Sequence, residues 1–314
     1  MTIRRRFLEP GALALILLLA FTSRALAQTP VTTPDDPDAI LTRALELRRL
    51  NRKADALATI ERAVTIAPER SDIVWWRDLL EHEVHGWEVT IGGEYRDWDE
   101  TRTPWREAQF TVRRNTAFGP LATRAAHARA FGRSDQRLEL EAYPAFRSGY
   151  GFLGVGYATD ATLYPRSSIA GELFTSFATR YEASVGYRRL NFRNEVNVFT
   201  GSLGGYYDAF FLGARVNSVT GGATGTAGTF ILRRYLSDDG QYVGLQASTG
   251  SVREQIESAL DLAALSSTSI GADALFIIQS TIVLTGHATV GDEELITGNT
   301  TTFWSVNLAV GVRF

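Results

Sequence analysis

The sequence predicts an all-β transmembrane antiparallel β-barrel of about 14 strands, preceded by a small α-helical segment. Three observations predict it. The chain begins with a secretory signal, and from Gly86 to Phe314 apolar and polar residues alternate with a period of two. Most of these runs reach the ~9–11 residues that a tilted strand needs to cross a bilayer, whereas strands of soluble sandwiches have about five or six. About 12 strands is the alternative count.

Bulk composition is compatible with this fold but does not select it. The 314 residues are 45% hydrophobic and their mean hydropathy is −0.07, which is too polar for a helical membrane protein. A barrel shows such values because only alternate residues face lipid. Cysteine is absent, which excludes disulfide scaffolds and thiolate metal sites. The net charge of −3 does not indicate a nucleic-acid partner, and no motif indicates a cofactor or a metal ion.

Residues 1–27 have the features of a cleavable signal peptide. A basic region containing Arg4 precedes an apolar run from Ala12 to Phe21, and Ala25-Leu26-Ala27 supplies a cleavage site before Gln28. No cysteine follows that site, so a lipoprotein is not expected. Residues 28–37 contain three prolines and are predicted to be a linker.

Residues 38–85 are predicted to form three helices. The segments Asn51–Leu57 and Ala63–Pro68 resemble parts of a tetratricopeptide repeat. One repeat is too small to bury its own apolar face, so we expect it to pack on the barrel mouth or on a periplasmic protein partner. The expected anchors are Trp75, Trp76 and Leu79. The alternative is a generic helical hairpin that plugs or caps the barrel.

Residues 86–314 carry the period-two pattern of the predicted barrel. In the last strand, one face carries Trp304, Val306, Leu308, Val310, Val312 and Phe314. The segments Thr220–Thr226 and Ser251–Ser267 are expected to be loops. Tyrosines near strand ends, including Tyr150, Tyr187 and Tyr206, are expected in the aromatic girdles at the membrane surfaces.

Several peptides of this region resemble the YaiO family of outer-membrane β-barrel proteins. They are Glu141–Pro144, Tyr150–Tyr157, Leu163–Pro165, Ala183–Leu190, Thr200–Tyr207 and Arg233–Tyr235, in this order. The resemblance implies an outer-membrane location and a short tetratricopeptide-like N-terminus, and it brings no established activity. The apolar period-two ending in Phe314 is similar to the terminal strand that the barrel assembly machinery reads, so this machinery and outer-membrane lipid are expected partners.

The charged residues of the strands are expected to face the lumen, because a charge on the lipid face costs about 2–4 kcal/mol near the midplane. Two interpretations of these residues remain open. They form either an ion-lined lumen for sugars and other hydrophilic solutes or a web of arginine–carboxylate pairs that fills a narrow barrel. The expected lumen-lining residues are Glu94, Arg96, Arg113, Arg137, Glu139, Glu141, Glu182, Arg188, Arg215 and Arg234.

No catalytic site is predicted. The one weak candidate is a group formed by a histidine and two carboxylates. His287 is expected to face inward, and Asp292 and Glu293 follow at an expected strand end, where a carboxylate could orient a general base. The plainer interpretation is one polar lumen residue beside an acidic loop.

The function expected from the sequence is therefore non-catalytic. It is a pore or envelope assembly module for a polar solute or a polysaccharide. The alternatives are an outer-membrane enzyme acting on lipid or glycan and a structural barrel with a plugged lumen.

Overall fold

The computed structural model describes residues 36–50, 52–99, 103–116, 118–146, 149–178, 180–222, 224–237, 240–250, 267–279, 281–294 and 300–314. The predicted signal peptide with its cleavage site, most of the predicted linker and nearly all of the expected loop Ser251–Ser267 lie outside these ranges.

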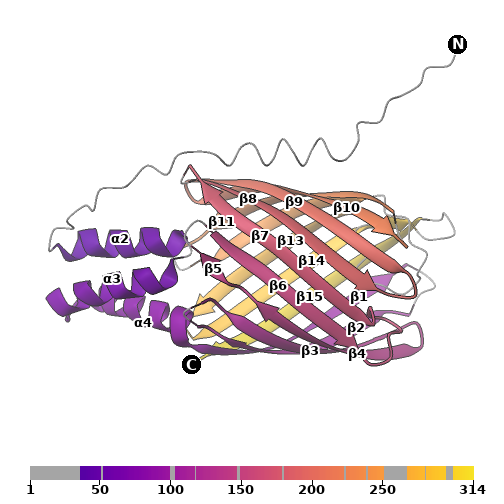
Figure 1. The fold of residues 1–314 in the computed structure, drawn as a ribbon, viewed down its shortest axis with the longest axis horizontal. Coiled ribbons are helices and arrows are strands. Elements are labelled where there is room, and N and C mark those ends of the chain that lie inside the picture. The colour runs from indigo at the N-terminus through magenta and orange to yellow at the C-terminus, as the bar shows by residue number, and fades with distance from the viewer. Residues whose placement is uncertain are drawn as a thin grey trace, which may run out of the picture. The chain divides into compact units, whose positions relative to one another are not determined.

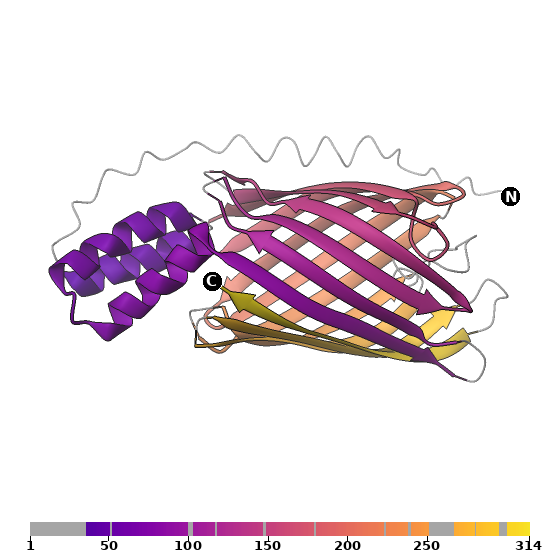
Figure 2. The same cartoon turned by 90° about the horizontal axis from the view of Figure 1, so that it is seen from below.

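The described strands form one closed antiparallel barrel, as predicted (Figure 1). Fourteen of its 15 strands are long, and the remaining one, β5 (Ala145–Phe146), is a two-residue strand paired with β6 (Gly149–Ala158). Closure has two parts. The first strand, β1 (Trp87–Trp98), pairs with the last, β15 (Thr300–Arg313), and β6 also pairs with β4 (Arg133–Ala142). Figure 2 shows the first strand in purple beside the last in yellow.

The remaining strands connect these elements in simple up-and-down order. They are β2 (Trp105–Arg114), β3 (Leu121–Ala130), β7 (Ser167–Phe177), β8 (Tyr181–Asn191), β9 (Glu195–Tyr207), β10 (Phe210–Gly221), β11 (Gly225–Tyr235), β12 (Tyr242–Gly250), β13 (Ser267–Ile278) and β14 (Ile282–Glu294).

The apolar face of the barrel points outward, because alternate side chains of a strand lie on opposite faces. On β15, Leu308 is 63% exposed, whereas its inward neighbour Ala309 is 9% exposed. The same outward positions carry Trp304 and Val310, both exposed. The predicted register of this strand is therefore confirmed.

One expected loop is mostly strand. β10 continues to Gly221 and β11 begins at Gly225, so the segment Thr220–Thr226 is largely a tight hairpin. Gly221 has φ +100°, and a Cβ there would lie 2.2 Å from the carbonyl oxygen of Glu195. Glycine meets both requirements, because it has no Cβ and tolerates positive φ.

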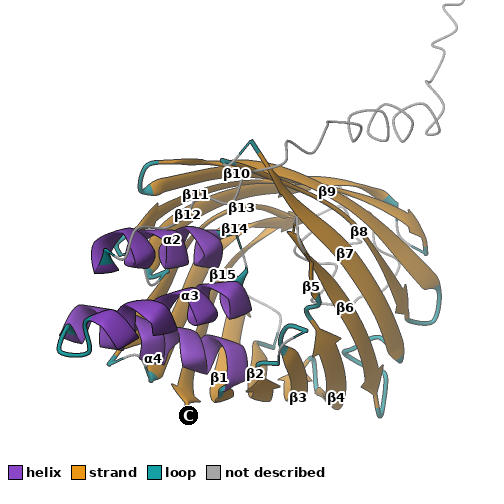
Figure 3. Ribbon diagram, turned by 60° about the vertical axis from the view of Figure 1, so that its left-hand side comes forward, coloured by secondary structure: helices purple, strands orange, loops and turns teal. Residues whose placement is uncertain are grey.

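Three helices precede the barrel, as expected: α2 (Pro37–Arg49), α3 (Lys53–Ile66) and α4 (Ser71–His85). Figure 3 shows them side by side at the end of the barrel where β1 begins and β15 ends. Helix α2 starts with Pro37 after the N-cap Asp36, whose side chain accepts from the N–H of Asp38. No helix of the described residues is long and apolar enough to cross a membrane.

The helices have an apolar core of their own. It contains Ile40, Ala44, Leu47, Ala56, Leu57, Ile60, Ala63, Ile73, Leu80 and Val84. Leu79 is fully buried and Trp76 packs against this core, so the expectation that both are exposed anchors is wrong. The periodicity of apolar residues does not distinguish those that are buried between the helices from those that stay exposed. Resemblance to a tetratricopeptide repeat stays a prediction.

Candidate functional site: the barrel lumen and its helix-side mouth

The structure places nearly all of the expected lumen-lining residues on the inner face of the barrel. The alternation of each strand puts inside Glu94, Arg96, Arg113, Arg137, Glu139, Glu141, Glu182, Arg188 and Arg215. Arg234 is the exception. Its side chain is exposed on the outer face, with its guanidinium carbon 5.9 Å from the ring centre of Phe210. The inward member of the doublet is Arg233, which pairs with Asp273 of β13 at 3.0 Å.

Ion pairs join neighbouring and more distant strands across the inner face. Arg96 of β1 contacts Glu293 of β14 at 2.9 Å, although the two residues are 197 positions apart. Arg215 of β10 contacts Glu172 of β7 at 2.6 Å. Arg96 and Glu293 are both buried, so each neutralises a charge that water does not reach, whereas Arg215 is partly exposed.

The end of the lumen remote from the helices is partly filled by the chain itself. The connection between β6 and β7, residues 159–166, is held there by Asp135 of β4, which is 1% exposed. Its carboxylate accepts hydrogen bonds from the backbone N–H groups of Asp160, Thr162, Leu163 and Tyr164, at 2.8–3.2 Å. Four charge-assisted bonds to one side chain fix the position of this connection.

This connection packs against an apolar cluster. Leu163 and Tyr164 are buried among Trp98, Trp105 and Phe303. The Tyr164 hydroxyl donates to Glu107 at 2.7 Å, and the guanidinium of Arg137 lies 4.3 Å from the ring centre of Tyr164. The sequence analysis did not predict this role for Asp135. Asp135 lies at an alternate position of β4 with Arg137 and Glu139, so the same period-two pattern would have placed it on the inner face.

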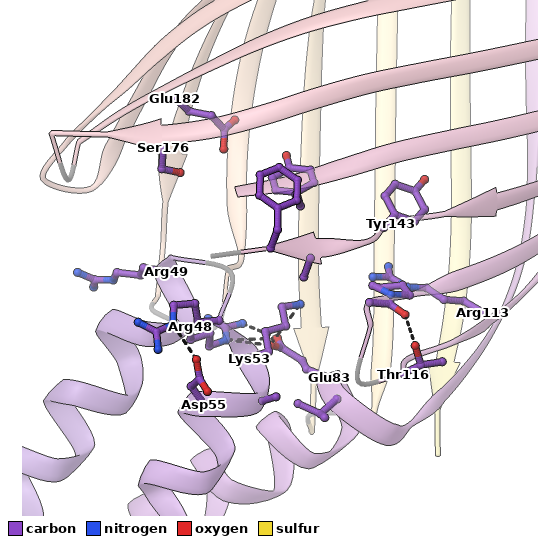
Figure 4. Close-up of a pocket in the computed structure, with 18 of the residues that line it drawn as sticks. Arg48, Arg49, Lys53, Asp55, Glu83, Arg113, Thr116, Tyr143, Ser176 and Glu182 are labelled. Carbon is purple, nitrogen blue, oxygen red and sulfur yellow. Dashed lines mark hydrogen bonds and ion pairs between the residues drawn. The ribbon is translucent and has the colours of Figure 1, made fainter. Parts of the chain in front are cut away.

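A cavity of about 690 Å³ lies where the helices meet the barrel, shown in Figure 4. Both parts of the chain contribute to its walls. The helices supply Arg48, Arg49, Arg52, Lys53, Asp55 and Glu83, and the barrel supplies Arg113, Tyr143, Tyr150, Glu182 and Tyr206.

Glu83 organises the helix side of this cavity. It accepts a two-point contact from Arg48, with the shortest distance 2.7 Å, and lies 3.4 Å from the ammonium group of Lys53. Burial opposes ionisation of this carboxyl, but Lys53 and Arg48 overcome it and hold the pKa of Glu83 at about 2. Asn115, after β2, donates from its amide to the carbonyl oxygen of His82 at 2.8 Å. This contact ties α4 to the barrel rim.

The tyrosines divide between the two faces. Tyr157 and Tyr187 are exposed on the outer face, as expected of a girdle. Tyr150 and Tyr206 instead lie inside and line the helix-side cavity. Proximity to a strand end was therefore not enough to predict the face, which depends on the register of each strand.

A second cavity, of about 300 Å³, lies among β6–β10 within the lumen. Its wall contains Glu172, Arg188, Arg215, Thr200 and Asn217. Thr200 donates to the side-chain oxygen of Asn217 at 2.8 Å. The wall thus offers guanidinium, carboxylate, amide and hydroxyl groups within a small space.

The predicted group around His287 does not form. β14 continues to Glu294, so alternation persists and directs Asp292 outward, where it accepts from Thr302 at 2.8 Å. Glu293 points inward but is bound by Arg96 and by the indole N–H of Trp98, at 2.9 Å each. His287 contacts Thr289 and Gln246. Within the described ranges, no three histidine, aspartate or glutamate side chains are grouped as metal ligands.

The YaiO membrane beta barrel domain model matches residues 87–255, which are more than half of the chain. The protein belongs to the YaiO family. The predicted resemblance is therefore confirmed, and this membership together with the closed barrel indicates an outer-membrane protein.

Solved structures similar to this YaiO barrel are other outer-membrane barrels. Omp33 of Acinetobacter baumannii has 12% identity, covers 74% of this chain and 100% of its own, and gives a TM-score of 0.46. A bacterial polysaccharide outer membrane secretin has 11% identity, covers 74% and 99%, and gives 0.47. The KdgM porin has 10% identity, covers 70% and 97%, and gives 0.40. No functionally curated protein matches the sequence.

Proposed function

We propose that this YaiO protein is a non-catalytic outer-membrane conduit for hydrophilic molecules, either small polar solutes or a polysaccharide. We propose further that helices α2–α4 control access at its periplasmic mouth. The observation that carries the proposal is the inner surface of the barrel, which combines charged and hydroxyl groups with two cavities of about 690 and 300 Å³.

The strand number supports a conduit of moderate width. Barrels of about eight strands are filled by their own side chains, whereas about 16–18 strands leave an aqueous channel. The described barrel has 14 long strands and uses an inward connection to narrow one end. The lumen therefore has space at the end near the helices and is narrowed by the β6–β7 connection at the opposite end.

The lining chemistry suits sugars and similar polar molecules. Guanidinium and carboxylate groups can donate to and accept from hydroxyls, and tyrosine rings offer flat apolar faces beside a hydroxyl. Both kinds of group occur in the helix-side cavity, whose wall contains Tyr150 and Tyr206 as well as Arg113 and Glu182. Because many arginines of the inner face are paired with carboxylates, the wall has little net charge at these positions. It would therefore suit neutral hydrophilic molecules as well as charged ones.

The contacts of the helices with the cavity support a role in regulating entry. Arg48 and Lys53 contribute to the cavity wall and are held by Glu83, so movement of α2 and α3 would change the mouth directly. We propose that a periplasmic protein partner binds residues 38–85 and causes such a movement. Of the three expected anchors, Trp75 is the one that we still propose as a contact of this partner, because its side chain is only half-buried.

Proteoliposome swelling tests the proposal. Refolded full-length protein is compared with a variant lacking residues 38–83, using a series of sugars of increasing size. The barrel of the variant should still form, because β1 and β15 pair through Trp87 and Phe314 without the helices. We expect sugar entry in both proteins, with a larger size limit in the variant. Absence of swelling in both, with heat-modifiable gel migration proving that both are folded, would exclude a conduit.

A further inference from the structure

Two arginines lie side by side on the outer face of the barrel, near the strand ends remote from the helices. Arg106 of β2 and Arg129 of β3 are directly opposite in the antiparallel register, and both are exposed. Directly opposite residues have Cβ atoms about 4.5–5.5 Å apart, and like charges at such positions destabilise a sheet. The fold itself therefore gains nothing from this pair.

No carboxylate neutralises the two arginines within the described part of the chain. The outward positions of β2, β3 and β4 carry no aspartate or glutamate. The outward carboxylate of the neighbouring β1, Asp97, accepts from the Tyr95 hydroxyl at 3.1 Å and forms no ion pair with either arginine among the described residues. The contact shown for Arg106 is with the ring of Tyr95, whose centre lies 5.8 Å from the guanidinium carbon. An anion from outside the chain would satisfy both guanidinium groups.

The residues around the pair indicate what kind of molecule carries that anion. Three consecutive outward rows run across β2, β3 and β4: Arg106, Arg129 and Ser134, then Ala108, His127 and Gln136, then Phe110, Ala125 and Leu138. Basic and hydrogen-bonding side chains thus give way to apolar ones within two steps along each strand. A ligand that fits has an anionic, hydroxyl-rich head joined to apolar chains.

We propose that Arg106 and Arg129 bind the phosphate groups of lipopolysaccharide in the outer leaflet of the membrane. Both ends of a bacterial barrel chain lie on the periplasmic side, so the strand ends carrying this patch face the outer leaflet. Guanidinium groups bind phosphate through two parallel hydrogen bonds, and one phosphate between two of them removes their repulsion. His127, Ser134 and Gln136 bind sugar hydroxyls beside the phosphate.

The β2 strand also supplies a matched control. Its outward residues are Arg106, Ala108, Phe110, Val112 and Arg114, so an arginine lies at each end of an apolar stretch. Arg114 lies at the helix end, 5.2 Å from the ring centre of Trp87, and has no opposing arginine because its partner on β3 is Leu121.

The experiment is a titration of fluorescent lipopolysaccharide into full-length protein refolded in detergent. It compares the wild type, the double variant Arg106→Gln/Arg129→Gln, and Arg114→Gln. We expect the dissociation constant to rise at least tenfold in the double variant and less than twofold in Arg114→Gln. Dephosphorylated lipopolysaccharide should bind the wild type as weakly as the phosphorylated form binds the double variant.

Folding of each variant is checked by heat-modifiable gel migration. Without lipid, the double variant should unfold at the same temperature as the wild type or higher, because repulsion has been removed. If it does not fold, Arg129→Gln alone replaces it, with an expected loss of at least threefold. If the double variant, or Arg129→Gln where that replaces it, binds lipopolysaccharide with the affinity of the wild type, the proposal is wrong. Equal competition by phosphatidylglycerol micelles would overturn the assignment to the glycolipid.

Discussion

Arg96 and Glu293 form an ion pair of 2.9 Å across the inside of the barrel, and both side chains are less than a tenth exposed. They come from β1 and β14, which are not neighbours, because β15 pairs with both. The guanidinium of Arg96 also lies 3.7 Å from the ring centre of Phe303 on β15. This pair therefore connects the three strands around the closure of the barrel.

Removing one member of this pair should destabilise the barrel strongly. An unpaired buried charge costs about 3–5 kcal/mol, so we expect Glu293→Ala to lower the free energy of unfolding by that amount. The double variant Arg96→Ala/Glu293→Ala should lose less than the sum of the single losses, measured by urea unfolding in lipid. The exposed pair Arg189–Glu195 is the control, since Arg189→Ala should cost less than about 1 kcal/mol. If the loss of unfolding free energy in the double variant equals the sum of the two single losses, Arg96 and Glu293 do not stabilise the barrel as a pair.

Asp135→Ala should release the inward connection between β6 and β7. Hydrogen bonds to a charged group contribute about 1.5–3 kcal/mol each, and four backbone donors of the connection would lose their acceptor. We expect at least about 3 kcal/mol of destabilisation and faster trypsin cleavage after Arg166, which follows the tethered residues. Asp160→Ala is the control, because the Asp160 side chain is exposed. Equal cleavage rates in both variants would show that Asp135 does not hold the connection.

The outward face of β15 should not accept charge. Leu308→Arg places a cation against lipid and should cost about 2–4 kcal/mol and reduce insertion sharply. The adjacent inward substitution Asn307→Ser keeps a polar group in a polar lumen and should change insertion little. The measurement is the folded fraction in membranes for both variants. Comparable insertion would mean that the register is shifted by one residue, which reverses the faces.

The helices should loosen in acid through Glu83. The pKa of this carboxyl is about 2 in the folded protein, below the ordinary glutamate value of 4.5, because Lys53 and Arg48 favour the charged form, so ionised Glu83 stabilises the helices. That contribution, about 3 kcal/mol, is complete above pH ~4.5 and is lost as the pH falls toward 2. The protection of residues 38–85 against hydrogen exchange, corrected for the intrinsic exchange rate at each pH, should fall over this range. Glu83→Gln should exchange faster at pH 7 and lose most of the acid dependence, and an unchanged acid dependence in that variant would assign the effect to another group.

Sequence alternation predicted the barrel well, because the lipid penalty for charge applies to every strand alike. It predicted about 14 strands, in agreement with the 14 long strands of the structure, as well as the register of Trp304 and Leu308 and the inward face of most charged residues. It failed at Arg234, where both faces of β11 carry apolar residues. Ile231 lies on the inner face and Phe230 on the outer face, so pattern alone could not choose between Arg233 and Arg234.

The candidate site was less predictable, since it depends on contacts between distant segments. Asp292 and Glu293 looked like a strand end, and only the full length of β14 shows that they lie on opposite faces. The tether from Asp135 to Tyr164 joins residues 29 positions apart through backbone groups, which no side-chain pattern records. The cavity between Glu83 and Tyr206 likewise requires the helices and the barrel together.

Single-channel recording in planar bilayers tests the conduit most directly. The full-length protein, shown to be folded by its heat-modifiable migration, is added to one side and the current is measured at fixed voltage. The polar lumen and its two cavities predict discrete current steps. Folded, inserted protein that gives no steps, either intact or without residues 38–83, would contradict a conduit and would indicate a structural barrel with a plugged lumen.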